Sequence, residues 1–200
     1  MHYDVTREAI DAMMKSPGEV RGTVFKTDES FILEKGGPKK LIEIERELDE
    51  MGYPFLYKDI DNMKYYPWGR RILSLLAISR VLNMDKSKVE EMGRVAPKKS
   101  FIVRFFMRHF FTIESTFKKA SEMWREHHTI GRLEVVELNN EEKKAIVRLY
   151  NLNFHPIFCD YLCGYFAAIA KMVEGKEVKC EEVKCFFKGE SFFHEFLLTW

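Results

Sequence analysis

The sequence predicts an α+β protein in which an N-terminal helical bundle packs on an antiparallel sheet of two hairpins with an intervening helix. Apolar residues recur at helical spacing through the first two-thirds of the chain, and after Gly131 their period changes to two. The last third then reads hairpin, helix, hairpin. We therefore expect one domain over residues 1–200, mostly helical over 1–130 and β-hairpin–helix–β-hairpin over 131–200.

The helical part begins with a short amphipathic segment at 4–14 and a candidate strand at 20–25. A short helix is expected at 28–35. Gly36-Gly37-Pro38 then ends one element and starts another, because proline suits a first helical turn. The next helix is predicted by the apolar spacing and ends at Gly52-Tyr53-Pro54; its apolar positions are Leu41, Ile44, Leu48 and Met51.

A strongly apolar helix is expected from Pro67 to about Leu82. Ser87-Lys88-Val89-Glu90 has the pattern of a capping box, which predicts a helix start there. Pro97 is expected to end that helix. Two further helices are expected, over 100–111 and over 113–127.

The predicted sheet starts with a strand that ends at Asn139-Asn140, and 146–150 form its hairpin partner. Pro156 opens a helix and Gly175 ends it. The second hairpin, 177–187 with 191–198, turns around Lys188-Gly189-Glu190.

Composition limits the class of protein. The chain of 200 residues is 46% hydrophobic and 32% charged, and its net charge of +1 gives no overall attraction to nucleic acid or to an anionic membrane. It holds no apolar run of about 18 residues, so no transmembrane segment is expected. Met1 to Ser16 lacks the core of a signal peptide. We expect a cytoplasmic protein, whose cysteines are more often thiols or metal ligands than disulfides.

All four cysteines lie between Phe158 and Phe187. Cys159 and Cys163 share one helix face because they are four residues apart. Cys180 and Cys185 are five apart, which would place them on opposite faces of a regular strand. A bulge near Glu181 or Glu182 would reconcile them and re-aim the Glu182 side chain. Small apolar packing, a metal site and a disulfide all remain open.

The same stretch resembles the 4-vinyl-reductase-like (vinyl-4-reductase) domain family over residues 131–198. The resemblance rests on these positions: Cys159, Gly164-Tyr165, Gly175, Glu182-Val183-Lys184-Cys185 and Gly189. It implies a fold distantly similar to haem–nitric-oxide/oxygen sensor domains and to small trafficking-complex subunits. It also implies that Cys159, Glu182 and Cys185 are ligands of a zinc ion, which is therefore a candidate cofactor.

The fourth ligand position of that family falls on Phe193, which cannot bind a metal. His194 is adjacent but would point to the opposite face of a regular strand. Cys163 and Cys180 are alternative fourth ligands.

The resemblance further implies an apolar ligand cavity. The basic and aromatic stretch Lys98–Phe111 is either one wall of that cavity, a core helix with a solvated basic face, or a membrane-surface helix. Trp124-Arg125-Glu126-His127-His128 offers a flat apolar ring and imidazoles, or is simply a polar helix end. The predicted ligand-binding residues are Phe105, Phe106, His109, Trp124, His128 and Tyr165.

Haem is not expected, because the Tyr-x-Ser-x-Arg motif of the haem-binding relatives is missing. Phosphate-loop, nucleophile-elbow and zincin motifs are missing too. We predict a non-enzymatic small-molecule-binding or sensor domain with a Phe-rich cavity for a hydrophobic ligand, acting as a homodimer without nucleic acid. The alternatives are an enzyme acting on a tetrapyrrole or a hydrophobic aromatic compound, and a dimerising scaffold.

Overall fold

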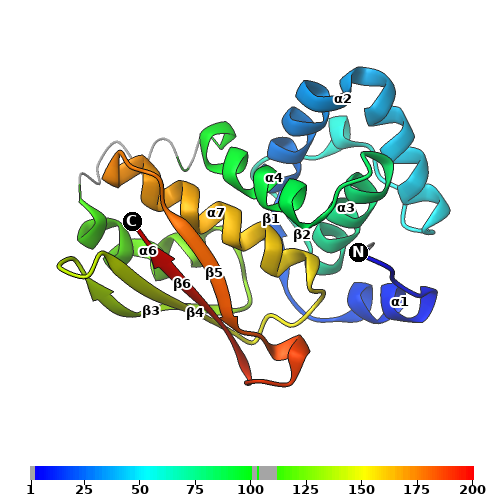
Figure 1. Ribbon diagram of the computed structural model, residues 1–200. Helices are drawn as coiled ribbons and strands as arrows, with labels where there is room; N and C mark the ends of the chain where they lie inside the picture. Colours follow the sequence, from blue (N-terminus) through cyan, green and yellow to red (C-terminus); the bar gives the residue numbers. More distant parts are fainter. Residues whose placement is uncertain (1–2, 101–102, 104–111) are drawn as a thin grey trace.

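The computed structural model describes residues 3–100, 103 and 112–200 and has the α+β architecture that the sequence predicts (Figure 1). Its helices are α1 (Arg7–Lys15), α2 (Thr23–Glu50), α3 (Trp68–Val81), α4 (Lys86–Lys99), α6 (Ile113–His127) and α7 (Ile157–Glu174). Its strands are β1 (Glu19–Arg21), β2 (Tyr65–Pro67), β3 (Arg132–Asn139), β4 (Lys144–Tyr150), β5 (Lys179–Lys184) and β6 (Phe193–Thr199).

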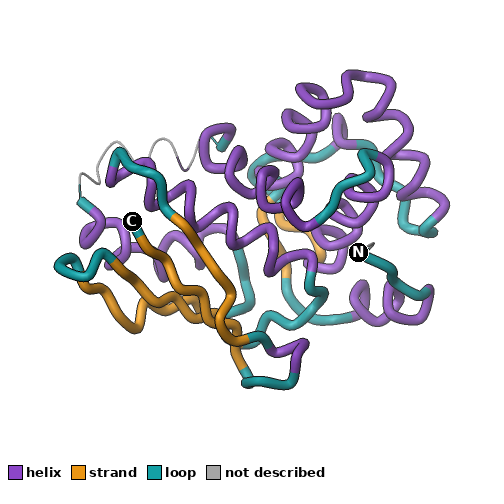
Figure 2. Tube along the Cα trace, in the orientation of Figure 1, coloured by secondary structure: helices purple, strands orange, loops and turns teal. Residues whose placement is uncertain are grey.

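The larger sheet is antiparallel with the strand order β3-β4-β6-β5 (Figure 2). Its inner face carries the buried side chains Leu133, Val147, Leu149, Phe196 and Leu198. Helix α6 contacts β3, and α7 contacts β5 and β6. On the outer face, Arg148 and Lys184 pair with Glu195 at 2.6 and 3.3 Å. The helices therefore cover one face of the sheet and leave the other with charged side chains, as the alternation of apolar and polar residues in an antiparallel sheet allows.

Helix α7 lies between the sheet and the helices α3 and α4 (Figure 1). Two glycines allow α4 and α7 to approach closely. A Cβ atom on Gly93 would clash with the Tyr161 carbonyl oxygen, and one on Gly164 would clash with that of Glu90. This central position lets α7 contribute residues to both sites described below.

Several predicted boundaries need correction. The candidate strand at 20–25 is only Glu19–Arg21, which pairs with the unpredicted strand β2. The predicted break at Gly36-Gly37-Pro38 is present, because Gly37 is non-helical with φ 71° and separates two helices within the range of α2. The first of these helices begins at Thr23 and not at Asp28. Asp85, and not Ser87, caps α4 by accepting a hydrogen bond from the Lys88 amide.

Pro97 does not end α4, which continues to Lys99. The predicted helix at 100–111 lies almost wholly outside the described residues. None of the helices in the described part of the chain combines the length and the apolar character that a membrane span requires.

Candidate functional site

An apolar cavity of about 110 Å³ lies where the helices meet the sheet. Its walls come from α2, α3, α4, α6 and α7 and from β3 and β4. Arg71 is the one charged side chain among the described residues that line it, and the other polar groups are hydroxyls and two histidines. An apolar space with few polar groups is the usual form of a small-molecule site.

The two histidines at the end of α6 have unpartnered ring nitrogens. His127 is buried, and neither of its ring nitrogens has a hydrogen-bond partner. His128 is half-buried, but its Nδ1 is buried and equally unpartnered. Its ring lies between Trp124 and Trp68, with centroid separations of 4.0 and 5.4 Å.

Burial keeps both imidazoles neutral. It lowers the pKa of His127 to about 4, with a smaller contribution from the charge of Arg21. Burial also lowers the pKa of His128 well below the ordinary value, and the charges of His127 and Arg71 act in the same direction. A neutral imidazole can donate and accept one hydrogen bond each, or bind a metal.

Arg71 is fully buried at the cavity wall. Its Nη1 pairs with the buried Asp28 carboxylate, which also accepts a 2.7 Å hydrogen bond from Ser74 Oγ. The guanidinium lies over the Tyr161 ring, 4.8 Å from the centroid. Its Nη2 has no hydrogen-bond partner among the described residues. An N–H group left in this state is costly, because it has lost water without gaining an acceptor.

Of the predicted ligand-binding residues, Trp124, His128 and Tyr165 line this cavity. Phe105, Phe106 and His109 lie outside the described residues. The sequence reasoning did not select Arg71 or His127. Arg71 follows another arginine in the sequence, and the helical spacing of the apolar residues on α3 was the one signal that it faces inward.

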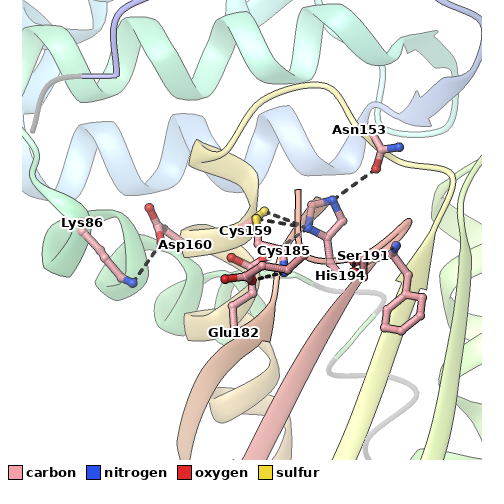
Figure 3. Close-up of polar contacts among 10 residues, drawn as sticks. Lys86, Asn153, Cys159, Asp160, Glu182, Cys185, Ser191 and His194 are labelled. Carbon is pink, nitrogen blue, oxygen red and sulfur yellow. Dashed lines mark hydrogen bonds and ion pairs between the residues drawn. The ribbon is translucent and has the colours of Figure 1, made fainter. Parts of the chain in front are cut away.

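A second site joins α7, β5 and β6 (Figure 3). We call it the thiol cluster, and its members are Cys159, Glu182, Cys185 and His194. One ligand atom from each of the four lies within 4.8 Å of all the others. His194 Nδ1 is 2.8 Å from Glu182 Oε1, 3.4 Å from the Cys159 sulfur and 3.8 Å from the Cys185 sulfur.

The local fold explains why these residues meet. The register between β5 and β6 shifts between Glu182 and Lys184, so the predicted bulge is present and Cys185 turns inward. On β6, His194, Phe196 and Leu198 share the buried inner face. Phe193 lies on the outer face over Arg148. The expectation that His194 points away from the cysteines is therefore wrong, because its face is that of Phe196.

The polar atoms of the thiol cluster satisfy one another. Burial would raise the pKa of Glu182, but hydrogen bonds from His194 and the two thiols lower it overall. Burial would likewise lower the pKa of His194, and the Glu182 carboxylate raises it instead. The Cys159 thiol holds the pKa of Cys185 at about 6 despite burial. His194 Nε2 is 3.2 Å from Asn153 Oδ1.

Cys163 and Cys180 are not members of the four-residue group, and all four cysteines of the chain are free. The thiol cluster thus offers two sulfurs, one imidazole nitrogen and one carboxylate oxygen. Thiolate and imidazole are preferred by borderline and soft transition metals.

No family model matches the sequence, and no curated protein matches it. Solved structures do match the fold. An H-NOX protein from Shewanella oneidensis in the Fe(II)NO state has a TM-score of 0.68 and 14% identity, over 89% of this chain and 97% of that chain. A triple mutant of an H-NOX protein from S. oneidensis in the Fe(II) state has a TM-score of 0.70 and 13% identity, over 90% and 95%.

An oxygen-binding H-NOX domain related to soluble guanylate cyclases has a TM-score of 0.62 and 14% identity, over 90% of this chain and 94% of that chain. These identities are low, so the likeness establishes the fold alone. The predicted similarity in fold to haem–nitric-oxide/oxygen sensor domains is confirmed. Membership of the 4-vinyl-reductase-like family stays a prediction.

The cofactor prediction was wrong. The structures that share this fold are haem domains, and one of them is described in terms of haem redox potential and porphyrin distortion. The absence of the Tyr-x-Ser-x-Arg motif was therefore not sufficient reason to exclude haem. These structures do not support the prediction that zinc is a cofactor. The cavity residues fit haem in one respect: His127 and His128 offer buried, unpartnered nitrogens of the kind that bind haem iron.

Proposed function

We propose that this chain is a sensor domain that binds a small apolar molecule in the cavity between its helices and its sheet. The observation that carries this proposal is the set of buried, unpartnered ring nitrogens at the cavity, namely both of His127 and the Nδ1 of His128. Buried polar atoms in proteins are nearly always hydrogen-bonded. A bound molecule would supply the missing hydrogen-bond partners. It would also contact both α6 and α7.

Equilibrium binding tests the proposal. The test ligand is a single-ring aromatic compound such as acetophenone. Its binding is measured by titration calorimetry and by the change in the thermal unfolding temperature. We expect saturable binding that raises the unfolding temperature, because a ligand of the native state stabilises it by mass action. Leu162→Trp, which fills the cavity from α7, should abolish binding while the far-ultraviolet spectrum is unchanged. Unaltered binding by that variant would contradict the proposal.

Haem is a second candidate occupant, favoured by the imidazoles. His127 and His128 are the described residues that would hold its iron, and lining side chains would have to move to admit a porphyrin. Haem, when bound, supplies an iron that takes small gases. The test is the Soret band of reduced protein titrated with haem. A shift that disappears in His127→Ala or His128→Ala supports this candidate, and a spectrum equal to that of free haem contradicts it.

We also propose that the thiol cluster binds a transition-metal ion through Cys159, Glu182, Cys185 and His194. The support is the convergence of four ligand atoms within 4.8 Å, with Cys159, Cys185 and His194 buried. Asn153 accepts from His194 Nε2, which leaves Nδ1 free to coordinate. A bound ion in this position would join the helix α7 to both strands of the second hairpin.

Cobalt(II) is the probe for this site, because its thiolate complexes absorb visible light. We expect sulfur-to-cobalt charge-transfer bands on titration of the reduced protein, with loss of the bands in Cys185→Ser. Cys163→Ser is the matched control, since it removes a buried α7 thiol outside the four-residue group and should keep the bands. A wild-type protein without such bands would contradict the metal proposal.

Two further features of the proposed sensor are an absence of catalysis and a homodimeric assembly. In a homodimer, a ligand-induced change in one subunit could be transmitted to the other across the interface. Light scattering at tens of micromolar tests the assembly, and a monomer mass there would overturn it.

A further inference from the structure

The outer face of the larger sheet, on the side away from α6 and α7, has no helix over it in the described part of the chain (Figure 1). Its two central strands nevertheless present partly exposed apolar side chains there: Ile146, Tyr150, Phe193 and Leu197. Phe192 lies at the end of this face with 74% of its surface exposed, and its ring centroid is 5.1 Å from that of Phe193. Contiguous exposed apolar surface of this kind marks an interaction site.

Charged residues form one row across the same face. The strand register places Glu134, Arg148, Glu195 and Lys184 opposite one another, on β3, β4, β6 and β5 in that order. The sign of the charge therefore alternates from one edge of the sheet to the other. Within one chain, Glu195 binds Arg148 at 2.6 Å and Lys184 at 3.3 Å. Glu134, at the far edge, pairs with Arg132 of its own strand.

A second copy of this face matches the first when it is turned about a two-fold axis parallel to the strands. Such a turn reverses the strand order, so β3 faces the partner's β5 and β4 faces the partner's β6. Glu134 then faces Lys184 of the partner subunit, and Arg148 faces Glu195 of the partner subunit. An in-plane axis perpendicular to the strands would instead place Glu134 against its own copy. Like charges across an interface are costly, so the first arrangement is the complementary one.

The apolar residues on either side of the charged row obey the same symmetry. On one side the register pairs Tyr150 with Phe193, and on the other side it pairs Ile146 with Leu197. The turn that matches the charges therefore places ring against ring and aliphatic side chain against aliphatic side chain. Two sheets packed in this way lie about 10 Å apart with their strands within about 30° of each other, as in β-sandwiches.

Acidic residues stand at both ends of the aliphatic row. The register places Glu137 opposite Ile146 and Glu181 opposite Leu197. The same turn brings Glu137 towards Glu181 of the partner subunit, which is an unfavourable contact. Its cost is small, because both acids lie at the solvated edges of the sheet and Lys144 pairs with Glu137 at 3.0 Å. The central contacts therefore outweigh this one.

We propose that the outer face of the sheet β3-β4-β6-β5 is the interface of a homodimer, in which a second copy of this chain packs face to face about a two-fold axis parallel to the strands. This inference rests on the homodimer that belongs to the proposed function, and it adds the surface that the two subunits share. The helices and the cavity of each subunit stay on the sides of the dimer that face away from the partner.

Charge reversal with rescue tests the inference on the full chain, and sedimentation equilibrium measures the dimer dissociation constant. Glu134→Lys places a lysine against Lys184 of the partner subunit at two symmetry-related positions. We therefore expect the dissociation constant to rise about tenfold or more. Lys184→Glu should have the same effect. The double variant restores opposite charges across the interface and should restore the dimer.

The rescue separates a contact between subunits from one within a chain. Glu134 and Lys184 lie on the two edge strands of the sheet, three strand spacings or about 14 Å apart, so they cannot pair in a single subunit. Lys39→Glu, an exposed reversal on α2, is the matched control and should dimerise as the wild type does. If Lys184→Glu does not fold beside Glu195, Phe192→Ser replaces it and should also weaken the dimer.

The outcomes distinguish the interface from the assembly and from ligand binding. Wild-type dimerisation in Glu134→Lys together with either second variant overturns the assignment of the interface, as does a folded double variant that stays monomeric. A wild-type protein that sediments as a monomer overturns the homodimer and this inference together. Binding of acetophenone by the same samples decides the ligand-binding function separately, because the cavity lies on the other side of the sheet.

Discussion

The cavity and the thiol cluster both take residues from α7, and they differ in how their polar atoms are satisfied. In the thiol cluster, His194 has partners on both ring nitrogens, Glu182 and Asn153. In the cavity, His127 has partners on neither, and Arg71 leaves one nitrogen unpaired. The thiol cluster satisfies its own polar atoms, and our proposal is that a bound molecule completes those of the cavity.

The largest expected effect comes from removing the counter-charge of Arg71. Asp28→Asn leaves a buried guanidinium uncompensated, and breaking such a pair costs about 3–5 kcal/mol of unfolding free energy. Urea denaturation measures it. The double variant Asp28→Leu with Arg71→Met should recover most of the loss, because an apolar pair of similar volume removes both charges. A loss below about 1 kcal/mol in the single variant would show that the pair is not buried as described.

A matched pair of histidine variants tests the difference between the two sites. His194→Leu removes the partner of Glu182 and Asn153, so we expect a loss of about 1–3 kcal/mol in unfolding free energy. His127→Leu removes two atoms that have no partners, so its effect should be near zero or stabilising. Chemical denaturation of the metal-free, ligand-free protein compares them. Equal losses would contradict the distinction between the two sites.

A smaller effect is expected at the edge of the thiol cluster. Asn153→Ala removes the acceptor of His194 Nε2 and should cost about 0.5–1.5 kcal/mol of unfolding free energy. It should also weaken cobalt(II) binding by about 10- to 100-fold, as loss of such supporting groups does in other metal sites. Thermal unfolding and cobalt titration measure the two effects. Unchanged cobalt affinity would mean that Asn153 does not orient His194.

The sequence could predict most of the thiol cluster, because the patterns that indicate its residues lie within short segments of the chain. Helical spacing placed Cys159, and the change of parity along β5 indicated a bulge that turns Glu182 and Cys185 inward. His194 was missed because the family pattern pointed to Phe193. The alternation of His194 with Phe196 and Leu198 on the buried face was the signal for the correct residue.

The cavity was harder to predict, since its decisive contacts are distant in sequence. Asp28 and Arg71 come from different helices, and the pattern of α3 does not say which of its two adjacent arginines finds a carboxylate. Trp124, His128 and Tyr165 were placed by the resemblance and not by a physical argument. The local signal at Gly36-Gly37-Pro38 did predict the interruption of α2, whereas α4 continues past Pro97 to Lys99.

The most direct test of this account is one spectrum that reports both sites at once. Long-range ¹H–¹⁵N correlation of the histidine rings is recorded for the metal-free protein before and after saturation with acetophenone. The account predicts that the ring nitrogens of His127 or His128 shift while those of His194 do not. Saturation that leaves both cavity histidines unchanged, or that shifts His194 as strongly, would contradict it.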